Sequence, residues 1–156
     1  INIIAKTRNW NQLTVITDRA YSENIINKQE AYNNKSIALF EIAKIKMKSD
    51  TKEAIKLIEK AISFNKNFPP YIKLYLEILF ATNNISKIQK VLKKQWTDSP
   101  SSLLRSSITE VIKKNNIREI GFIKNFISRN INNEESKKIL VDFAIYLNEW
   151  SISRST

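Results

Sequence analysis

The stretch Glu53-Ala-Ile-Lys-Leu-Ile-Glu-Lys-Ala61 decides the fold class that we predict for this chain. Ala54 and Ala61 stand seven residues apart, and the apolar residues around them recur at the three- and four-residue spacing of one helix face. Ser49-Asp50-Thr51 forms a short polar break before this segment, and Asp50 or Thr51 can cap the helix that follows. The stretch therefore predicts an amphipathic helix that begins directly after a polar turn.

The same order of helix, polar turn and helix recurs along the chain. The turns end at residues 10, 51, 85, 117 and 150, so their successive spacings are 41, 34, 32 and 33 residues. Asn tolerates the left-handed backbone that ends a helix, so it can replace Gly, of which the chain has one. A period of about 34 residues with two helices per unit is typical of tetratricopeptide repeats. The predicted turns are Arg8-Asn9-Trp10, Ser49-Asp50-Thr51, Asn83-Asn84-Ile85, Asn115-Asn116-Ile117 and Asn148-Glu149-Trp150.

These turns divide the chain into predicted helices. We expect an all-α antiparallel helix-pair solenoid of tetratricopeptide-like repeats, a right-handed superhelix that forms one domain over residues 1–156. Both ends fall inside a repeat, and a repeat cannot bury its apolar face alone. We therefore expect further repeats in a longer protein, or a homo-oligomer through the exposed repeat ends. The predicted helices cover about 11–22, 28–48, 52–65, 69–82, 86–97, 101–114, 118–129 and 133–147, with a fragment at 1–8 and a last helix from 150.

The composition excludes several kinds of chemistry. The chain has no His and no Cys, which rules out a Ser-His-Asp triad, a Cys nucleophile, a zinc finger and haem ligation by His or Cys. The single Gly, Gly121, rules out a Gly-rich phosphate-binding loop. We therefore expect no enzyme activity, no catalytic residue, no metal site and no cofactor.

The net charge of +11 has two interpretations. The chain holds 26 Ile, 18 Asn and 20 Lys, the residues of AT-rich codons, so the charge can reflect genome composition. It can instead mark a basic module that binds nucleic acid or an anionic membrane surface. A single-stranded nucleic acid would favour aromatic residues among the cations, but most aromatic residues here keep the spacing of a helix core. Nucleic acid is therefore the less expected partner. The most regular row of cations is Lys44, Lys46, Lys48, Lys52, Lys56 and Lys60.

Residues 36–150 resemble the HemY-type proteins of the cytoplasmic membrane. The resemblance rests on Ala54 with Ala61, Phe68-Pro-Pro70, Asn83-Asn84 and the spacing Trp96-x3-Pro100. Ser101-Ser102 departs from the family, which often continues that Pro with His-Pro, and Ile88 with Gln95 replaces the pair of small residues in the next unit.

The resemblance has implications for localisation and partners. HemY-type proteins carry two N-terminal membrane helices before a tetratricopeptide region. The resemblance implies that this chain is a fragment of a longer protein anchored in the bacterial inner membrane, on its cytoplasmic face, through a segment that this chain lacks. It also implies a scaffold associated with haem and porphyrin biosynthesis, whose partners are other proteins, such as enzymes of that pathway.

Charged positions on the first helix of successive pairs suggest a binding groove. A ladder of cations there could hold an acidic peptide, a carboxylate tail or propionate groups. The alternative is that Lys73–Glu77 and Lys138–Asp142 are ordinary ion pairs one turn apart on helix surfaces. The predicted groove residues are Lys73, Arg105 and Lys138, and, four positions further on, Glu77, Thr109 and Asp142.

Three tryptophans, Trp10, Trp96 and Trp150, stand at or near predicted helix junctions. Such rings either wedge neighbouring repeats together, with the indole N–H near a turn carbonyl, or anchor a partner protein. The sequence as a whole predicts a non-catalytic interaction scaffold, with the basic polyanion-binding module as the alternative.

Overall fold

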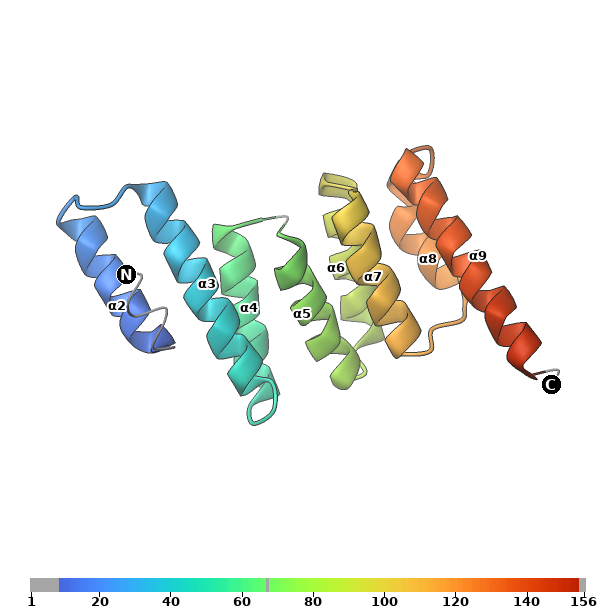
Figure 1. The fold of residues 1–156 in the computed structure, drawn as a ribbon, viewed down its shortest axis with the longest axis horizontal. Coiled ribbons are helices and arrows are strands. Elements are labelled where there is room, and N and C mark those ends of the chain that lie inside the picture. The colour runs from blue at the N-terminus through green and yellow to red at the C-terminus, as the bar shows by residue number, and fades with distance from the viewer. Residues whose placement is uncertain (1–8, 67, 155–156) are drawn as a thin grey trace. The chain divides into compact units, whose positions relative to one another are not determined.

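Helices make up all regular structure in the part of the chain that the computed structural model describes, which is residues 9–66 and 68–154 with side chains up to Asn148 (Figure 1). The expected all-α class is therefore confirmed. The predicted helix fragment at 1–8, with Arg8 of the first turn, lies outside the described residues. The elements are α2 Trp10–Ser22, α3 Lys28–Lys46, α4 Thr51–Phe64, α5 Pro69–Ala81, α6 Ile85–Asp98, α7 Ser102–Lys114, α8 Ile120–Ile127, the 3₁₀ helix η1 Ser128–Asn130 and α9 Glu134–Arg154.

Three helices end at an asparagine with left-handed backbone; two of these residues, Asn83 and Asn116, lie in predicted turns, and Asn24 lies in none. The φ angles are 56° at Asn24, 53° at Asn83 and 53° at Asn116. After each Asn, the next amide reaches back to a carbonyl in the last helical turn, which is the Schellman arrangement. The bonds are Ile25 N to Ala20 O at 2.8 Å, Asn84 N to Leu79 O at 3.2 Å and Ile117 N to Ile112 O at 3.2 Å.

Polar side chains also fix where most of the helices begin. A helix start leaves amide groups without partners, and the side chain of the capping residue accepts a hydrogen bond from one of them. Asp50 accepts from the amide of Glu53 at 3.0 Å, which places the start of α4 where the sequence predicts it. The other capping side chains are Asn9 for α2, Asn27 for α3, Asn84 for α6 and Ser101 for α7.

The chain divides into two compact units between Ile78 and Leu79, and each unit is described by itself. In the first unit α3 packs against both α2 and α4, and consecutive helices run antiparallel (Figure 1). Small side chains line these contacts: Ala38, Ala43, Ala54 and Ala61 are all fully buried. Because alanine has no bulk beyond Cβ, the backbones of α3 and α4 can lie close together.

In the second unit α8 packs against its neighbour α9, and helices that are not consecutive in the chain also pack together. α6 packs against α8 and α7 packs against α9, so the unit has two layers, with α7 and α9 in front in Figure 1. Large side chains fill the space between the layers. The Trp96 ring meets Phe126 edge-on, with 5.7 Å between ring centroids, and both side chains are fully buried.

One predicted turn is wrong. α9 runs without a break from Glu134 to Arg154, so residues 148–150 lie inside a helix and no new helix starts at 150. This stretch contains neither Gly nor Pro, and a single Asn148 costs a helix interior too little to end it. No helix in the described ranges combines the length and the apolar character that crossing a membrane requires.

Candidate functional site

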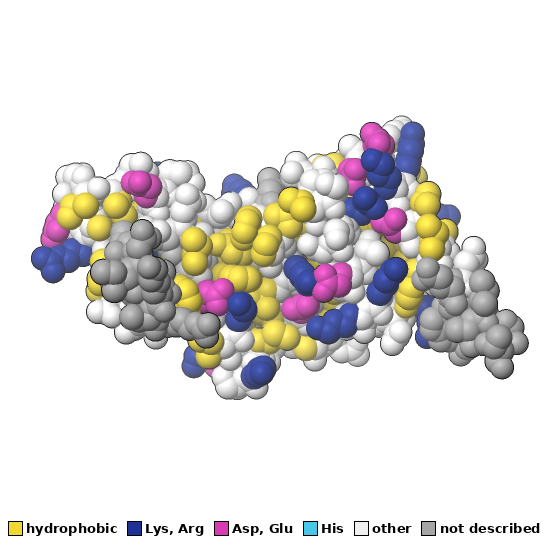
Figure 2. Space-filling view, viewed as in Figure 1, with side chains coloured by type: hydrophobic (Ala, Val, Ile, Leu, Met, Phe, Trp, Pro, Cys, Tyr) yellow, Lys and Arg dark blue, Asp and Glu magenta, His cyan; other side chains and the backbone are white. Residues whose placement is uncertain are grey.

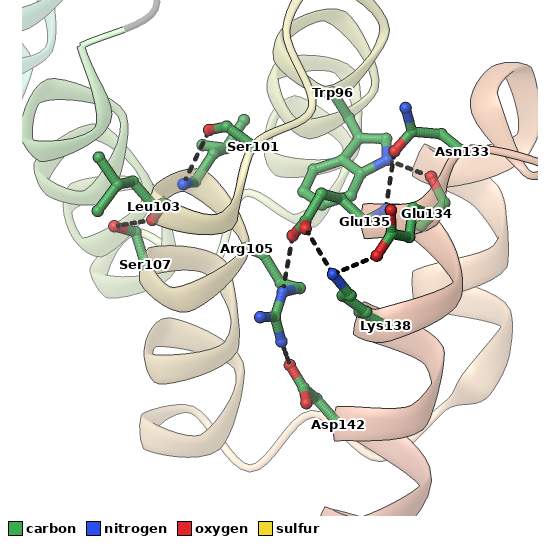
Figure 3. Close-up of polar contacts among 12 residues, drawn as sticks. Trp96, Ser101, Leu103, Arg105, Ser107, Asn133, Glu134, Glu135, Lys138 and Asp142 are labelled. Carbon is green, nitrogen blue, oxygen red and sulfur yellow. Dashed lines mark hydrogen bonds and ion pairs between the residues drawn. The ribbon is translucent and has the colours of Figure 1, made fainter.

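Arg105, one of the predicted groove residues, joins α7 to α9 through two carboxylates (Figure 3). Its Nε donates to Glu135 Oε2 at 2.9 Å, and its Nη1 donates to Asp142 Oδ2. The side chains of Arg105 and Glu135 are only 24% and 18% exposed, so water screens the pair weakly. Burial acts to lower the pKa of Arg105, but the hydrogen bonds and charges of Asp142 and Glu135 outweigh it and raise that pKa. Arg105 therefore acts as a link between two helices.

Lys138 extends the same network at the start of α9. Its Nζ lies 2.6 Å from Glu134 Oε1 and 3.4 Å from Glu135 Oε1. The hydrogen bond to Glu134 raises the pKa of Lys138, and the same bond lowers the pKa of Glu134. In place of the expected Lys138–Asp142 pair, Lys138 thus binds carboxylates in the turn before it, and Asp142 binds Arg105.

Glu135 is the central residue that the sequence analysis missed. Its carboxylate receives hydrogen bonds from both Arg105 and Lys138. Two acids in the first turn of α9 were a readable signal, because a helix N-terminus favours negative charge. The pairing with Arg105, thirty residues earlier, was not readable from spacing within one helix.

A groove of about 310 Å³ lies between α7 and α9. Thr109 and Asp142 line this groove, and they also line an adjoining cavity of about 10 Å³. The hydroxyl oxygens of Thr109 and of Tyr146, which lines the small cavity, are buried and have no hydrogen-bond partner. Buried polar atoms without partners are uncommon, and the cavity beside these two has room for about one water-sized group. The groove is lined by Arg105, Ser106, Thr109, Lys113, Asp142 and Ile145.

Lys113 is the exposed cation of this groove. Its Nζ lies over the ring of Tyr146, 5.8 Å from the ring centroid. The described residues give it no carboxylate partner, in contrast to Arg105. Ile145, on the other wall, is 49% exposed. On the side of the second unit that α7 and α9 form, Figure 2 shows Lys and Arg side chains interspersed with Asp and Glu.

The structure brings four of the six predicted groove residues together: Arg105, Thr109, Lys138 and Asp142 all lie on α7 or α9. The other two, Lys73 and Glu77, lie on α5 in the first unit and are half-buried. Lys73 and Arg105 belong to different compact units, and a continuous ladder between them stays a prediction.

The three tryptophans have different surroundings. Trp96 is fully buried, and its Nε1 donates to the Ser136 hydroxyl at 2.7 Å, which joins α6 to α9. Its partner is thus a side chain of another helix, not the turn carbonyl that we expected. Its burial leaves no ring surface for a partner protein. Trp10 is half-buried at the start of α2, and the side chain of Trp150 lies outside the described residues.

Within the described ranges, no group of three or more acidic, His or Cys residues is placed to hold a metal ion. Comparisons of this chain with protein families, with characterised proteins and with solved structures found no match.

Proposed function

We propose that this chain is a non-catalytic protein-interaction module whose groove between α7 and α9 receives a segment of a partner protein. The observation that carries the proposal is the makeup of that groove. It combines an exposed cation, Lys113, with an exposed apolar side chain, Ile145. These groups lie on two helices that Arg105 holds together, so the groove is formed before a partner arrives.

The chemistry of the groove indicates the kind of segment that fits. Arg105 and Asp142 neutralise each other's charge, which leaves Lys113 as the cation that a ligand can use. A carboxylate can pair with its ammonium group, while an apolar side chain of the same segment covers Ile145. The proposed ligand is therefore a peptide segment with an acidic residue close to an apolar one.

The same proposal includes a finer description of the fold, a right-handed tetratricopeptide-like array. Two features support it: α6 on α8 and α7 on α9 stack as alternate helices of a repeat array do, and the left-handed residues Asn83 and Asn116 are 33 positions apart. An experimental structure of the full chain tests it, and a closed bundle in place of stacked pairs would contradict it.

A peptide-display library offers a direct test of the groove. We expect peptides selected on the full chain to be enriched in an acidic residue next to an apolar one. Binding of these peptides should fall at least tenfold in Lys113→Glu and in Ile145→Asp, a change of about 1.4 kcal/mol in binding free energy.

Val141→Asp is the matched control for Ile145→Asp. Val141 lies one turn earlier on α9, is 58% exposed and does not line the groove, so the control adds the same charge to the same helix. Peptide affinity should stay unchanged in this variant. Equal losses in both variants, or selected peptides without acidic residues, would contradict the proposal.

The link to porphyrin metabolism, the haem-pathway partners and the tether to the inner membrane rest on the HemY-type resemblance alone, and they stay predictions. Deleting the gene for the full protein should alter the cellular levels of porphyrin intermediates. Unchanged intermediates would contradict this part of the proposal and leave the groove untouched.

A further inference from the structure

The two layers of the second unit differ sharply in charge. α6 together with α8 and η1 carries six cations and a single acid, Asp98, whereas α7 and α9 mix acids with cations along their length. If codon usage alone explained the lysines, both layers would hold a similar excess. The uneven placement is therefore a property of this surface. The six cations are Lys87, Lys90, Lys93 and Lys94 on α6, Lys124 on α8 and Arg129 on η1.

The packing of α6 and α8 turns many of these cations outward. α6 buries the stripe Ile88, Leu92, Gln95 and Trp96, and the opposite side of the helix presents Lys90 and Lys94 one turn apart. On α8 the buried residues are Phe122, Ile123, Phe126 and Ile127, which leaves Lys124 exposed.

Hydrogen bonds hold the two helices of this layer side by side. The Gln89 side chain donates to the carbonyl of Phe122 at 3.3 Å. Asn130 donates to the carbonyls of Trp96 and Thr97 at 2.9 and 3.2 Å, so its neighbour Arg129 lies beside the last turn of α6. Four exposed cations therefore lie on these adjoining elements, and we call this set the basic face: Lys90, Lys94, Lys124 and Arg129.

The four cations of the basic face are available to bind a group of opposite charge. In the described part of the chain none of its four residues has an ion-pair partner, while Arg105 and Lys138 in the other layer are both paired. Unpaired cations grouped on one side attract a surface of opposite charge.

We propose that the basic face binds the surface of a lipid bilayer that contains anionic headgroups. Each Lys or Arg close to such a surface contributes about 1 kcal/mol, or about a fivefold gain in affinity. The aromatic residues of this layer favour lipid over single-stranded nucleic acid, because Trp96, Phe122 and Phe126 are buried and cannot stack on bases. Three of the four cations are lysines, which act as point charges and suit headgroups that present no fixed pattern.

Vesicle co-sedimentation of the full chain tests the proposal. The chain should sediment with vesicles of equal parts phosphatidylcholine and phosphatidylserine and stay in solution with phosphatidylcholine alone. Raising the salt concentration should release it, because screening shortens the reach of surface charge. Equal binding to both kinds of vesicle, or no binding to either, would overturn the proposal.

Neutral substitutions locate the contact. The triple variant Lys90→Gln, Lys94→Gln, Lys124→Gln should lose about a hundredfold in affinity for the anionic vesicles. The matched control is Lys46→Gln, Lys52→Gln, Lys60→Gln, which removes the same charge from exposed lysines of the first unit. The control should lose less than fivefold. Equal losses would show that net charge, not the basic face, drives binding.

Two further measurements test whether the variants stay folded and whether lipid is the preferred partner. Circular dichroism should show unchanged helical content in both triple variants, since Gln is a good helix former. A mixed-sequence RNA should bind more weakly than the anionic vesicles, and tighter RNA binding would overturn the choice of lipid as partner. Peptides selected on the α7–α9 groove should bind both variants normally, so this proposal and the proposed function can fail separately.

Discussion

The two units of this chain hold their helices together in different ways. In the first unit, alanines such as Ala54 and Ala61 let consecutive helices lie close together, and the buried Tyr71 adds one link between distant helices, from α5 to Ser36 on α3. In the second unit, large and charged side chains join helices that are distant in sequence, as Trp96 does with Ser136 and Arg105 with Asp142. The first kind of packing depends on the shape of one helix face. The second depends on specific pairs of side chains that lie far apart in the sequence and must match each other in size or charge.

This difference predicts that the two units respond differently to the same kind of mutation. An alanine seam tolerates no added volume, because the neighbouring backbone has no room to move. A core built on large side chains is instead most sensitive to truncation, which leaves a cavity.

The largest effect that we expect is that of Trp96→Ala. It removes a fully buried ring, its contact with Phe126 and its hydrogen bond to Ser136. Large-to-small changes of this kind cost about 3–5 kcal/mol of folding free energy. Hydrogen exchange by residue should show lost protection in the second unit and unchanged protection in the first.

Trp10→Ala provides the comparison in the first unit. Trp10 is half-buried at a helix start, so its truncation leaves a smaller cavity and should cost less than Trp96→Ala. Equal costs would show that the packing of Trp96 is not special to the second unit.

The next effect is that of Ala61→Leu in the first unit. The added side chain has no space between α3 and α4, and overpacking of this kind costs about 1–3 kcal/mol. Urea unfolding followed by circular dichroism measures the change. Ala144→Leu is the control, because Ala144 is exposed on α9 and its substitution should leave the stability nearly unchanged.

The seam that Ala61→Leu tests also shows what could be predicted from the sequence. The alanine pair, the capping Asp50 and the left-handed Asn83 all act within a few residues of chain, so spacing alone located them. The false turn at 148–150 shows the limit of local reasoning, because a polar sequence near a helix end does not by itself end the helix.

The candidate site was only partly predictable for a related reason. Arg105 and Asp142 were predicted as charged positions on the first helices of successive pairs, but their pairing through space depends on how α7 packs on α9. Neither Glu135 nor Lys113 has a distinctive spacing in the sequence. Only the packing of the helices shows that Glu135 binds Arg105 and that Lys113 lines the groove.

A smaller effect is expected for Arg105→Met, which breaks the link between α7 and α9. It leaves Asp142, which is 32% exposed, without its cation, and it leaves Glu135, which is 18% exposed, with Lys138 alone. Because both carboxylates still reach water, the cost should be about 1–2 kcal/mol, less than for a fully buried pair. Urea unfolding measures this cost.

Arg19→Met is the matched control in the first unit. Arg19 and Glu23 form an exposed pair at the end of α2, and such pairs contribute about 0.5 kcal/mol or less. If both arginine variants lose the same stability, the Arg105 network adds nothing beyond an ordinary surface pair.

The smallest effect concerns pH and the buried tyrosines of the first unit. Burial, and then the hydrogen bond to the Glu59 carboxylate, raise the pKa of Tyr75 well above its ordinary value of 10.0. The unfolded chain therefore releases this proton at lower pH than the folded chain. Stability from this group is complete below about pH 10 and is lost as the pH rises further, by about 1 kcal/mol at about pH 11.

Tyr75→Phe separates this titration from other alkaline effects. The variant lacks the hydroxyl and so should lose about 1 kcal/mol less stability than the parent chain between about pH 8 and about pH 11, whatever the substitution costs at about pH 8. Urea unfolding at both pH values measures the difference. Parallel curves for the two proteins would mean that Tyr75 ionises as easily in the folded chain as in the unfolded one, and that the close packing of the first unit does not protect its buried hydroxyl.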